Sequence, residues 1–377
     1  MQRILEGISA LKTALEGSRK VFLVCDGSWP YLNIGPAVEA AVAGIGSPVR
    51  KFSDFGSNPL YESVCKGVEE FNSSGCDTIV AVGGGSSIDV AKCIKLYCPS
   101  EPKLIAIPTT AGTGSESTRY AVAYRNGEKQ SITHESIIPD YAILEPSVLD
   151  SLPLYQKKCT MMDALCQAIE SWWSVNATEA SRVLSRQAIE LIMANWEAYI
   201  FKGLNSREIM RAANIAGQAI NITQTTAPHA FSYKLTSLFG LPHGHAVALC
   251  MPEIWEFMLD YLSFRPIEVS GEISLRSVFS DIANAMGTET PEDAISLFRS
   301  MMSRMGLSGQ TMHPQARKDG RWPSGAQSAL ECSDPLSEPE RADVLKTLAS
   351  SVNPIRLANN PVPISEPDAL AIYSKVF

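Results

Sequence analysis

Strand-like runs alternate with helical patterns over the first 145 residues and then stop, and this change of pattern constrains the fold most. The runs are short, apolar and β-branched, and lie at residues 20–25, 48–52, 78–82, 104–107 and 141–144. Helical patterns separate them at 59–72 and 86–97. Such alternation is typical of βαβ units, so we expect a mostly parallel, buried sheet. Asn126-Gly127 lies between two further runs and predicts an antiparallel hairpin.

From about residue 153 onward the chain has only helical patterns. The longest cover residues 157–175, 179–199, 206–223 and 245–262. A loop is expected around Pro314–Pro339 and a final helix at 366–375. We therefore predict an α/β domain at residues 1–150 and an all-helical domain at 151–377. Residues 1–17 have a helical apolar period and predict a surface helix.

Composition excludes several classes of protein. The 377 residues are 45% hydrophobic, which is too apolar for a disordered chain. The net charge of −8 offers no basic surface for nucleic acid or anionic membranes. No apolar stretch of about 18 residues is free of charges, so no membrane span is expected. Nine scattered cysteines without CxxC spacing argue against disulfides and thiolate zinc sites, and favour the reducing cytoplasm as the compartment.

Three glycines follow the strand-like run at 78–82 and precede the next helix. The backbone N–H groups of Gly83, Gly84 and Gly85 can approach an anion closely at a helix N-terminus, as in a dinucleotide phosphate cradle. The spacing is not GxGxxG. The alternative is a tight turn in which Ser86 is the N-cap and Asp89 completes a capping box. The local sequence leaves both interpretations open.

A second loop, Pro108–Glu116, follows the next strand and is rich in threonine and glycine. Its hydroxyl and N–H groups lie at the carboxyl end of the predicted sheet, where ligands bind in open α/β folds. An ordinary turn with Ser/Thr hydrogen bonds is the alternative. Because the two loops follow neighbouring strands, we favour one shared ligand.

Three of the five histidines fall in one stretch of the helical region, namely His229, His243 and His245. Asp163 lies upstream in a largely apolar helix, and Gln167 and Glu170 follow on the same helical face. A carboxylate in such a helix needs a partner, and neutral imidazoles with a metal ion supply one. Capping or surface histidines are the alternative to a metal site at Asp163, His229 and His243.

Together these stretches resemble the iron-containing (group III) alcohol dehydrogenases. The resemblance covers nearly the whole chain and rests on GGGSSIDVAK, PTTAGTGSE, PDYAILEPSVLDSLP, MDALCQAIESWWS, LPHGHAVAL and NPIRLANNPVPIS, in that order. It implies a dehydroquinate synthase-like fold, in which an α/β dinucleotide-binding domain joins an all-helical metal-binding domain. It also implies an active site in the cleft between the domains and a homodimer.

The resemblance assigns roles to individual residues. The metal ligands are Asp163, His229 and His243. The pyrophosphate turn comprises Gly83, Gly84, Gly85 and Ser86, with Asp89 in the helix that follows. The loop on the nicotinamide side supplies Thr109, Thr110, Gly112, Thr113 and Ser115. Asp26 resembles the acid that binds the ribose hydroxyls, and its charge should repel a 2′-phosphate, which favours NAD over NADP.

Two departures from the family pattern affect the site. Gln167 stands where the family usually has another histidine ligand, and its amide oxygen is a weaker, harder ligand. Related glycerol dehydrogenases hold zinc with an aspartate and two histidines, so the metal here is either Fe²⁺ or Zn²⁺. Tyr233 stands where many members have a histidine linked to proton relay. His245 is the other candidate relay, unless it only begins a helix.

These departures point to a subgroup. DALCQAIESWWS, TAPHAFSYKLTSLFGLPHGHA and NPIRLANNP are similar to the phosphonoacetaldehyde reductases, which form 2-hydroxyethylphosphonate. Lys234 is our first candidate for binding a dianionic phosphonate as a point charge, and Arg182 is the second. The alternative is that both are solvated helix charges.

We therefore expect metal-assisted hydride transfer between NAD(P)H and a small aldehyde, with the metal ion as Lewis acid. A general primary-alcohol or polyol dehydrogenase is the first alternative, and Lys234 would then be structural. A dehydroquinate synthase-like lyase, which recycles its nicotinamide, is the second. A catalytically silent relative is the third.

Overall fold

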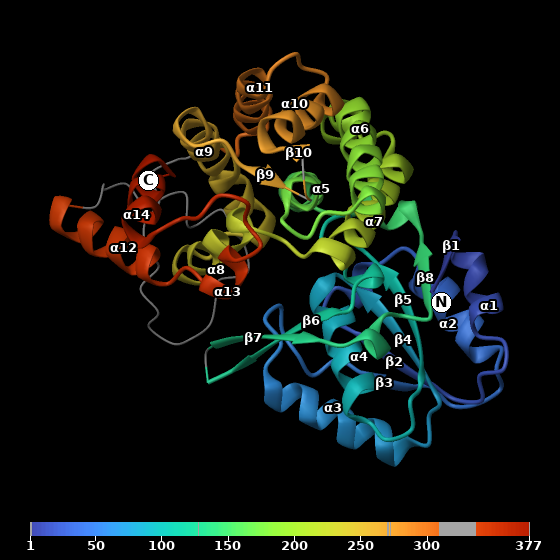
Figure 1. Cartoon of the computed structure of the whole chain (residues 1–377). Coiled ribbons are helices and arrows are strands. Elements are labelled where there is room, and N and C mark those ends of the chain that lie inside the picture. The colour runs from blue at the N-terminus through green and yellow to red at the C-terminus, as the bar shows by residue number, and fades with distance from the viewer. Residues whose placement is uncertain (1, 127, 270, 272, 309–336, 377) are drawn as a thin grey trace. The chain divides into compact units, whose positions relative to one another are not determined.

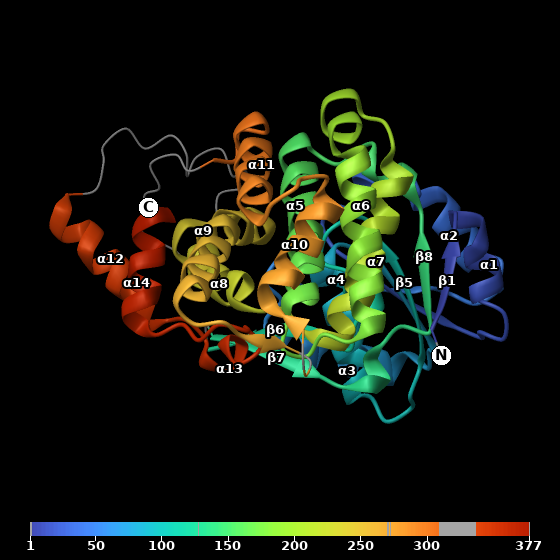
Figure 2. The ribbon, with the colours of Figure 1, turned by 45° about the horizontal axis from the view of Figure 1, so that its top comes forward.

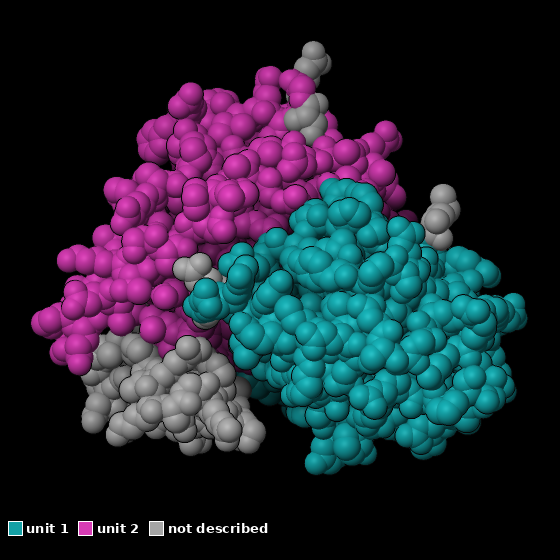
Figure 3. Space-filling model, turned by 90° about the horizontal axis from the view of Figure 1, so that it is seen from below, with its two compact units in different colours: residues 1–157, 197–221 teal, residues 158–196, 222–377 magenta. Residues whose placement is uncertain are grey.

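The computed structural model describes residues 2–376 except 127, 270, 272 and 309–336 (Figure 1). Its contacts divide the chain into two compact units, which Figure 3 draws in teal and magenta. Unit 1 comprises residues 1–157 and 197–221, and unit 2 comprises residues 158–196 and 222–377. None of the described helices is long and apolar enough to cross a membrane.

Unit 1 is built on a six-stranded sheet in the order β1-β8-β5-β4-β2-β3, and every pairing in it is parallel. The strands are β1 (Arg3–Glu6), β2 (Val21–Cys25), β3 (Arg50–Phe52), β4 (Thr78–Gly83), β5 (Lys103–Pro108) and β8 (Tyr141–Leu144). All residues of β2 and β4 are buried, which explains their continuous apolar sequences. The predicted parallel sheet is confirmed.

Helices and a hairpin surround this sheet (Figure 1). They are α1 (Leu11–Ala14), α2 (Gly35–Ala43), α3 (Tyr61–Ser74), α4 (Gly85–Tyr97), most of α7 (Ser206–Thr223), and the antiparallel pair β6 (Tyr120–Arg125) and β7 (Glu128–Thr133). The aromatic rings of Phe22, Phe52 and Phe71 pack together in the core beside α3 and α4. The predicted hairpin is confirmed.

The prediction of one surface helix over residues 1–17 is wrong. Residues Arg3–Glu6 form strand β1, which pairs with β8 at an edge of the sheet. Gly7 then adopts a φ of 81°, a left-handed value that ends the strand and suits glycine. The helical spacing of apolar residues corresponds to the short helix α1, where Leu11 and the C-cap residue Leu15 are buried. Backbone pairing with β8 outweighs the local helical pattern of residues 3–6.

Unit 2 is helical, as predicted, apart from a small ribbon of β9 (Glu268–Val269) and β10 (Ile273–Ser274). Its helices are most of α5 (Leu154–Trp173) and α6 (Glu179–Lys202), with α8 (Ala227–Phe239), α9 (His243–Phe264), α10 (Leu275–Met286), α11 (Pro291–Arg304), α12 (Glu338–Ser350), α13 (Pro354–Leu357) and α14 (Glu366–Val376). Helices α8 and α9 lie side by side (Figure 2). The predicted final helix corresponds to α14.

Most of the loop predicted at Pro314–Pro339, together with His313, lies outside the described residues. The boundary predicted for the end of this loop, Pro339, is wrong because α12 already begins at Glu338. Ser337 and Glu340 form a capping box there, and Pro339 occupies the first turn, where a proline is tolerated.

Candidate functional site

The sheet of unit 1 has a switch point between β2 and β4. From β2 the chain passes to β3 on one side, whereas β4 is followed by β5 and β8 on the other. Ligands of open α/β sheets bind outside the carboxyl ends of the strands at such a point. Asp26 follows β2 and Gly84 follows β4, so both predicted nucleotide-binding segments start at this place.

Asp26 is held by serine side chains. Ser28 donates to Asp26 Oδ1 from its backbone N at 2.8 Å and from its Oγ at 2.5 Å. Ser87 Oγ donates to Asp26 Oδ2 at 2.8 Å. Each carboxylate oxygen has two lone pairs, so Oδ2 keeps acceptor capacity that a ribose hydroxyl can use. Sequence reasoning missed Ser87, although it is part of the same glycine-rich motif.

Two glycines where β4 leads into α4, Gly83 and Gly85, have no room for a side chain. A Cβ atom at Gly83 would stand 2.2 Å from Ser87 Oγ, and one at Gly85 would stand 2.9 Å from Thr113 Cγ2. The capping-box interpretation is wrong, since Gly84 is the N-cap of α4 and no side chain caps this terminus. Ser86 Oγ instead donates to the Ser57 carbonyl at 2.5 Å. The first N–H groups of α4 have the character of an anion site.

The Thr/Gly loop after β5 lies against this turn, as expected from its position after the neighbouring strand. Thr109 N donates to the Gly83 carbonyl at 3.0 Å. A Cβ atom at Gly84 would be 3.5 Å from Thr110 Cγ2. Gly112 and Thr113 continue the same loop, so the residues expected to contact the nicotinamide and the pyrophosphate are adjacent.

A buried charged cluster supports the loop from α4. Ser115 Oγ donates to Asp89 Oδ1 at 2.6 Å, and Val122 N donates to Asp89 Oδ2 at 3.1 Å. Lys92 is completely buried, and its Nζ donates to Ser115 Oγ at 3.2 Å and to the Tyr120 carbonyl at 2.8 Å. Burial lowers the pKa of Lys92 to about 8, against the opposing effect of Asp89. Lys92 was not singled out from the sequence, although a lysine in a buried helix is a usable signal.

Helix α7 holds the same loop from another direction. Asn214 Nδ2 donates to Glu116 Oε1 at 2.8 Å and to Ser117 Oγ at 2.7 Å. A Cβ atom on Gly114 would stand 2.4 Å from Gly217 Cα, so the two backbones touch. Burial raises the pKa of Glu116. The loop is therefore fixed by buried polar contacts and by direct backbone packing.

The metal-ligand candidates converge in unit 2. Asp163 from α5, His229 from α8 and His243 from α9 place one ligand atom each within 4.8 Å of the others. His229 Nε2 lies 3.3 Å from Asp163 Oδ1. Gln167 is 3% exposed, and its Oε1 has no hydrogen-bond partner among the described residues. A carboxylate, two imidazoles and a buried amide oxygen fit a divalent metal ion.

Glu170 completes this face of α5 but makes different contacts. Its side chain is fully buried and accepts hydrogen bonds from Thr226 N at 2.9 Å and from Thr226 Oγ1 at 3.1 Å. It also pairs with His229 Nδ1. Burial lowers the pKa of His229, but the Glu170 and Asp163 carboxylates outweigh it and raise that pKa to about 10. Sequence reasoning placed Glu170 on the correct face without identifying this role.

The three predicted catalytic residues lie on α8 and α9. The ring of Tyr233 stacks on that of His243, with centroids 6.0 Å apart, and Lys234 follows it on α8 and is partly buried. His245 is 3% exposed, and its Nε2 lies 2.8 Å from the Leu307 carbonyl. Burial lowers the pKa of His245. The Leu307 carbonyl accounts for Nε2 only, and the proton-relay role of His245 stays a prediction.

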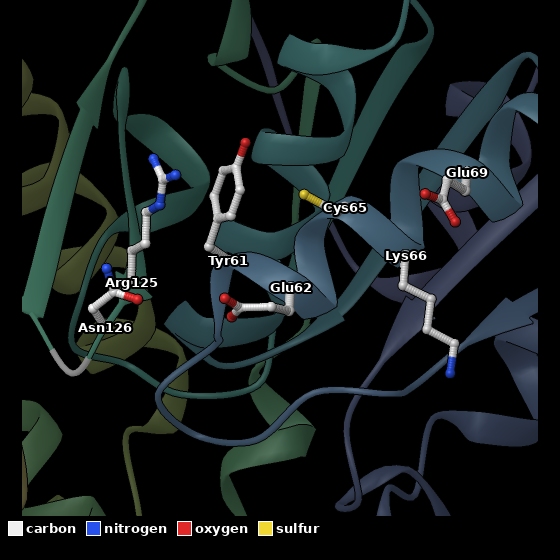
Figure 4. Close-up of a pocket in the computed structure, with 7 residues that line it drawn as sticks. All are labelled: Tyr61, Glu62, Cys65, Lys66, Glu69, Arg125 and Asn126. Carbon is white, nitrogen blue, oxygen red and sulfur yellow. The ribbon is translucent and has the colours of Figure 1, made fainter.

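Unit 1 has a separate hollow of about 610 Å³ beside α3 and the end of β6. Figure 4 shows the residues that line it. Its lining comprises Tyr61, Glu62, Cys65, Lys66, Glu69, Arg125 and Asn126, none of which is a predicted site residue. The Arg125 guanidinium lies 5.0 Å from the centre of the Tyr61 ring, so this cation already has a partner. The hollow adds nothing to the site described above.

Two family models match the chain. The model described as iron-containing alcohol dehydrogenase matches residues 3–146, and that of the C-terminal part of the Fe-containing alcohol dehydrogenase family matches residues 158–352. The probable alcohol dehydrogenase EutG of Escherichia coli is 31% identical over 72% of this chain and 71% of its own length. Sulfoacetaldehyde reductase of Bilophila wadsworthia is 29% identical over 67% of this chain and 72% of its own length.

The 1,3-propanediol dehydrogenase of Citrobacter freundii is 29% identical over 87% of this chain and 89% of its own length. Among solved structures, an iron-containing alcohol dehydrogenase from Thermococcus thioreducens aligns with a TM-score of 0.83 at 23% identity, over 100% of this chain and 98% of that one. Sulfoacetaldehyde reductase from Bifidobacterium kashiwanohense in complex with NAD⁺ aligns with a TM-score of 0.80 at 23% identity, over 100% and 96% of the two chains. These likenesses confirm the predicted fold.

Proposed function

We propose a function from one premise: the chain belongs to the iron-containing alcohol dehydrogenase family. The proposal is a metal-dependent oxidoreductase that interconverts a small aldehyde and its primary alcohol with a nicotinamide cofactor. The observation that carries it is the convergence of Asp163, His229 and His243 from three helices. We assign the dinucleotide to residues 1–150 and the metal to residues 151–377.

The proposed metal ligands are Asp163, His229 and His243, with the Gln167 amide oxygen as a fourth. These residues would hold a divalent ion, which would supply Lewis-acid chemistry for the substrate oxygen. Iron is the metal in the family name, and zinc is the alternative for this ligand set. The single carboxylate among neutral donors leaves positive charge for a developing alkoxide. Tyr233, which stacks on His243, is our proposed carrier of the proton through its hydroxyl group.

For the cofactor we propose NAD in preference to NADP. The Asp26 carboxylate at the switch point keeps an acceptor for a ribose hydroxyl and repels a 2′-phosphate. The uncapped start of α4 takes the pyrophosphate, and the Thr/Gly loop takes the nicotinamide side. We further propose a cytoplasmic homodimer, for which the edge strand β1 offers an open side.

As substrate we propose an aldehyde with an anionic group, and specifically phosphonoacetaldehyde. Lys234 is our first candidate for binding the anion, because it is a partly buried lysine on α8, the helix that also carries His229. Two relatives are named sulfoacetaldehyde reductase, and that substrate also has an anionic group next to an aldehyde. Arg182 is a second candidate for the anion. An uncharged primary-alcohol or diol substrate is the second candidate function, favoured by relatives named 1,3-propanediol and 1-propanol dehydrogenase.

An aldehyde panel tests the proposal. NADH and NADPH oxidation are measured with phosphonoacetaldehyde, sulfoacetaldehyde, propanal and glycolaldehyde, and bound metal is determined on the same samples. We expect one equivalent of metal per chain, net NADH consumption and a preference for the anionic aldehydes. A preference for uncharged aldehydes would contradict the phosphonate assignment. Absence of net NADH consumption would favour a lyase or a silent relative.

Lys234→Gln identifies the anion site. Loss of a hydrogen bond to a charged group costs about 1.5–3 kcal/mol, so kcat/KM for phosphonoacetaldehyde should fall about 10- to 100-fold. The value for propanal should change little. Lys346→Gln on α12 removes an exposed lysine and is the matched control. An equal loss for both aldehydes would mean that Lys234 has a structural role only.

A further inference from the structure

Glu170 is the third polar residue on the buried face of α5, yet it lies outside the ligand cluster. It follows Asp163 by two helical turns and has no exposed surface. Its Oε1 accepts from Thr226 N and Thr226 Oγ1, and from His229 N at 3.3 Å. Its Oε2 pairs with His229 Nδ1. One carboxylate therefore contacts both the ring and the backbone of a proposed metal ligand.

We infer that Glu170 is a positioning residue that sets the tautomer and orientation of His229. The inference rests on the proposed function, in which His229 binds the metal. A neutral imidazole has one N–H donor and one acceptor nitrogen. Because a carboxylate can only accept, Nδ1 keeps its proton when His229 becomes neutral on binding a metal ion, and Nε2 is the nitrogen that offers the lone pair. That nitrogen is the one that lies 3.3 Å from Asp163 Oδ1.

The carboxylate also caps the start of α8. Thr226 is the N-cap residue of α8 but makes no side-chain cap, and Glu170 accepts the N–H groups of Thr226 and His229 instead. A carboxylate at a helix N-terminus is favourable because the N–H groups there have no partner within the helix. Glu170 thus places the first turn of α8, which carries His229, against α5, which carries Asp163.

Buried aromatic residues hold this arrangement in place. Trp173 Nε1 donates to Thr226 Oγ1 at 2.8 Å, so the hydroxyl of Thr226 is directed toward Glu170. Trp173 packs edge-on against Trp255 at 5.5 Å and against Phe279 at 5.7 Å between ring centroids. Partners of metal-bound histidines that act in this way typically change metal affinity 10- to 100-fold when they are mutated.

Glu170→Gln tests the inference with almost no change of volume. Its amide has one oxygen and one NH₂ group, whereas all the groups that face Glu170 are donors. If the NH₂ faces Nδ1, the imidazole changes to the tautomer that protonates Nε2, which then cannot bind metal. If it faces Thr226, it meets a backbone N–H donor. We expect a Zn²⁺ affinity about 10- to 100-fold weaker than that of the wild-type protein.

Two further variants complete the experiment. Thr226→Val removes one donor to Glu170 and keeps the backbone N–H, so its affinity should lie between those of the wild type and Glu170→Gln. Glu253→Gln makes the same substitution on α9, at a carboxylate 2.9 Å from Arg299 and outside the contacts of His229. Its Zn²⁺ affinity should equal that of the wild type.

The readout is the Zn²⁺ dissociation constant of the full-length, metal-free proteins, measured by competition with a chelating indicator. Melting temperatures in EDTA report on folding. An affinity of Glu170→Gln within twofold of the wild type overturns the inference. If that variant does not fold, Thr226→Val decides, and an unchanged affinity has the same meaning. His243→Ala separates the proposed metal site from the proposed role of Glu170. If His243→Ala leaves Zn²⁺ binding intact, the metal site itself is wrong. If His243→Ala weakens Zn²⁺ binding and Glu170→Gln does not, only the role of Glu170 is wrong.

Discussion

Gly244 is a position at which one added methyl group should disturb the proposed metal site. It lies in the first turn of α9, between His243 and His245. A Cβ atom there would stand 2.1 Å from the carbonyl oxygen of Cys159 and 2.7 Å from Asp163 Cβ. Both atoms belong to α5, so α9 touches α5 through the bare backbone of Gly244. Gly244→Ala must force these two helices apart.

The size of the displacement follows from these contacts. Ordinary van der Waals contact starts near 3.4 Å, so the Cβ and the Cys159 oxygen must separate by about 1.3 Å. The oxygen is part of a helix backbone and cannot rotate away. Distances between a metal ion and its ligands tolerate changes of only about 0.2 Å. Asp163 is on α5 and His243 is on α9, so separating the two helices moves one proposed ligand away from the other. Overpacking of this kind also costs about 1–3 kcal/mol of folding free energy.

We therefore expect Gly244→Ala to lose at least tenfold in Zn²⁺ affinity and to melt at a lower temperature. The assay is Zn²⁺ competition with a chelating indicator, with melting curves recorded in EDTA and in Zn²⁺. In the wild type, Zn²⁺ should raise the melting temperature, and in the variant this increase should shrink. Gly56→Ala, where an added Cβ meets nothing within 4 Å, is the matched control. Wild-type affinity in Gly244→Ala would refute the reasoning, because the site would then tolerate a displaced helix.

Two predictions concern unit 1. Asp26→Ser removes the charge that should repel a 2′-phosphate. The ratio of kcat/KM for NADPH to kcat/KM for NADH should therefore rise about tenfold. An unchanged ratio would mean that the ribose binds elsewhere. Lys92→Met removes the buried hydrogen bonds of the Lys92 ammonium to Ser115 and to the Tyr120 carbonyl and should cost about 1–3 kcal/mol in urea unfolding. Because the pKa of Lys92 is lower in the folded protein than in the unfolded chain, the wild type should gain stability as the pH rises from about 8 toward 10.5, and the variant should lack this gain.

The central strands of the fold could be predicted because burial on both faces leaves a continuous apolar sequence. β2 and β4 are entirely buried, and both were located to within a residue at each end. β1 could not be predicted in the same way. It has four residues, lies at the sheet edge and is mostly exposed, so its sequence has no strand period. Its pairing with β8 joins residues far apart in the chain, which local patterns do not reveal.

The candidate site could be predicted where a motif implies direct contact with a ligand. The Gly- and Thr-rich loops were identified from residue types that suit close approach to phosphate. The supporting residues Ser87 and Lys92 were missed, because their importance depends on what they touch. Ser87 lies in α4, after β4, and contacts Asp26, which follows β2. Lys92 contacts Ser115, which is 23 residues later in the sequence. Both are ordinary helix residues when only their neighbours in the sequence are considered.

The α5 face shows how far periodicity can assign chemistry. Spacings of four and seven residues predict that Asp163, Gln167 and Glu170 share one side, and all three are buried there. The same spacing cannot distinguish a metal ligand from a residue that supports one. That distinction is made by α8, whose first residues arrive 56 to 59 positions later and present N–H groups to Glu170 but not to Gln167. A carboxylate that meets only donors is already satisfied, whereas a buried amide oxygen that meets no donor within the described part of the chain still requires a partner. On this physical ground we propose Gln167 as a ligand of the metal ion and Glu170 as a residue that supports the ligands.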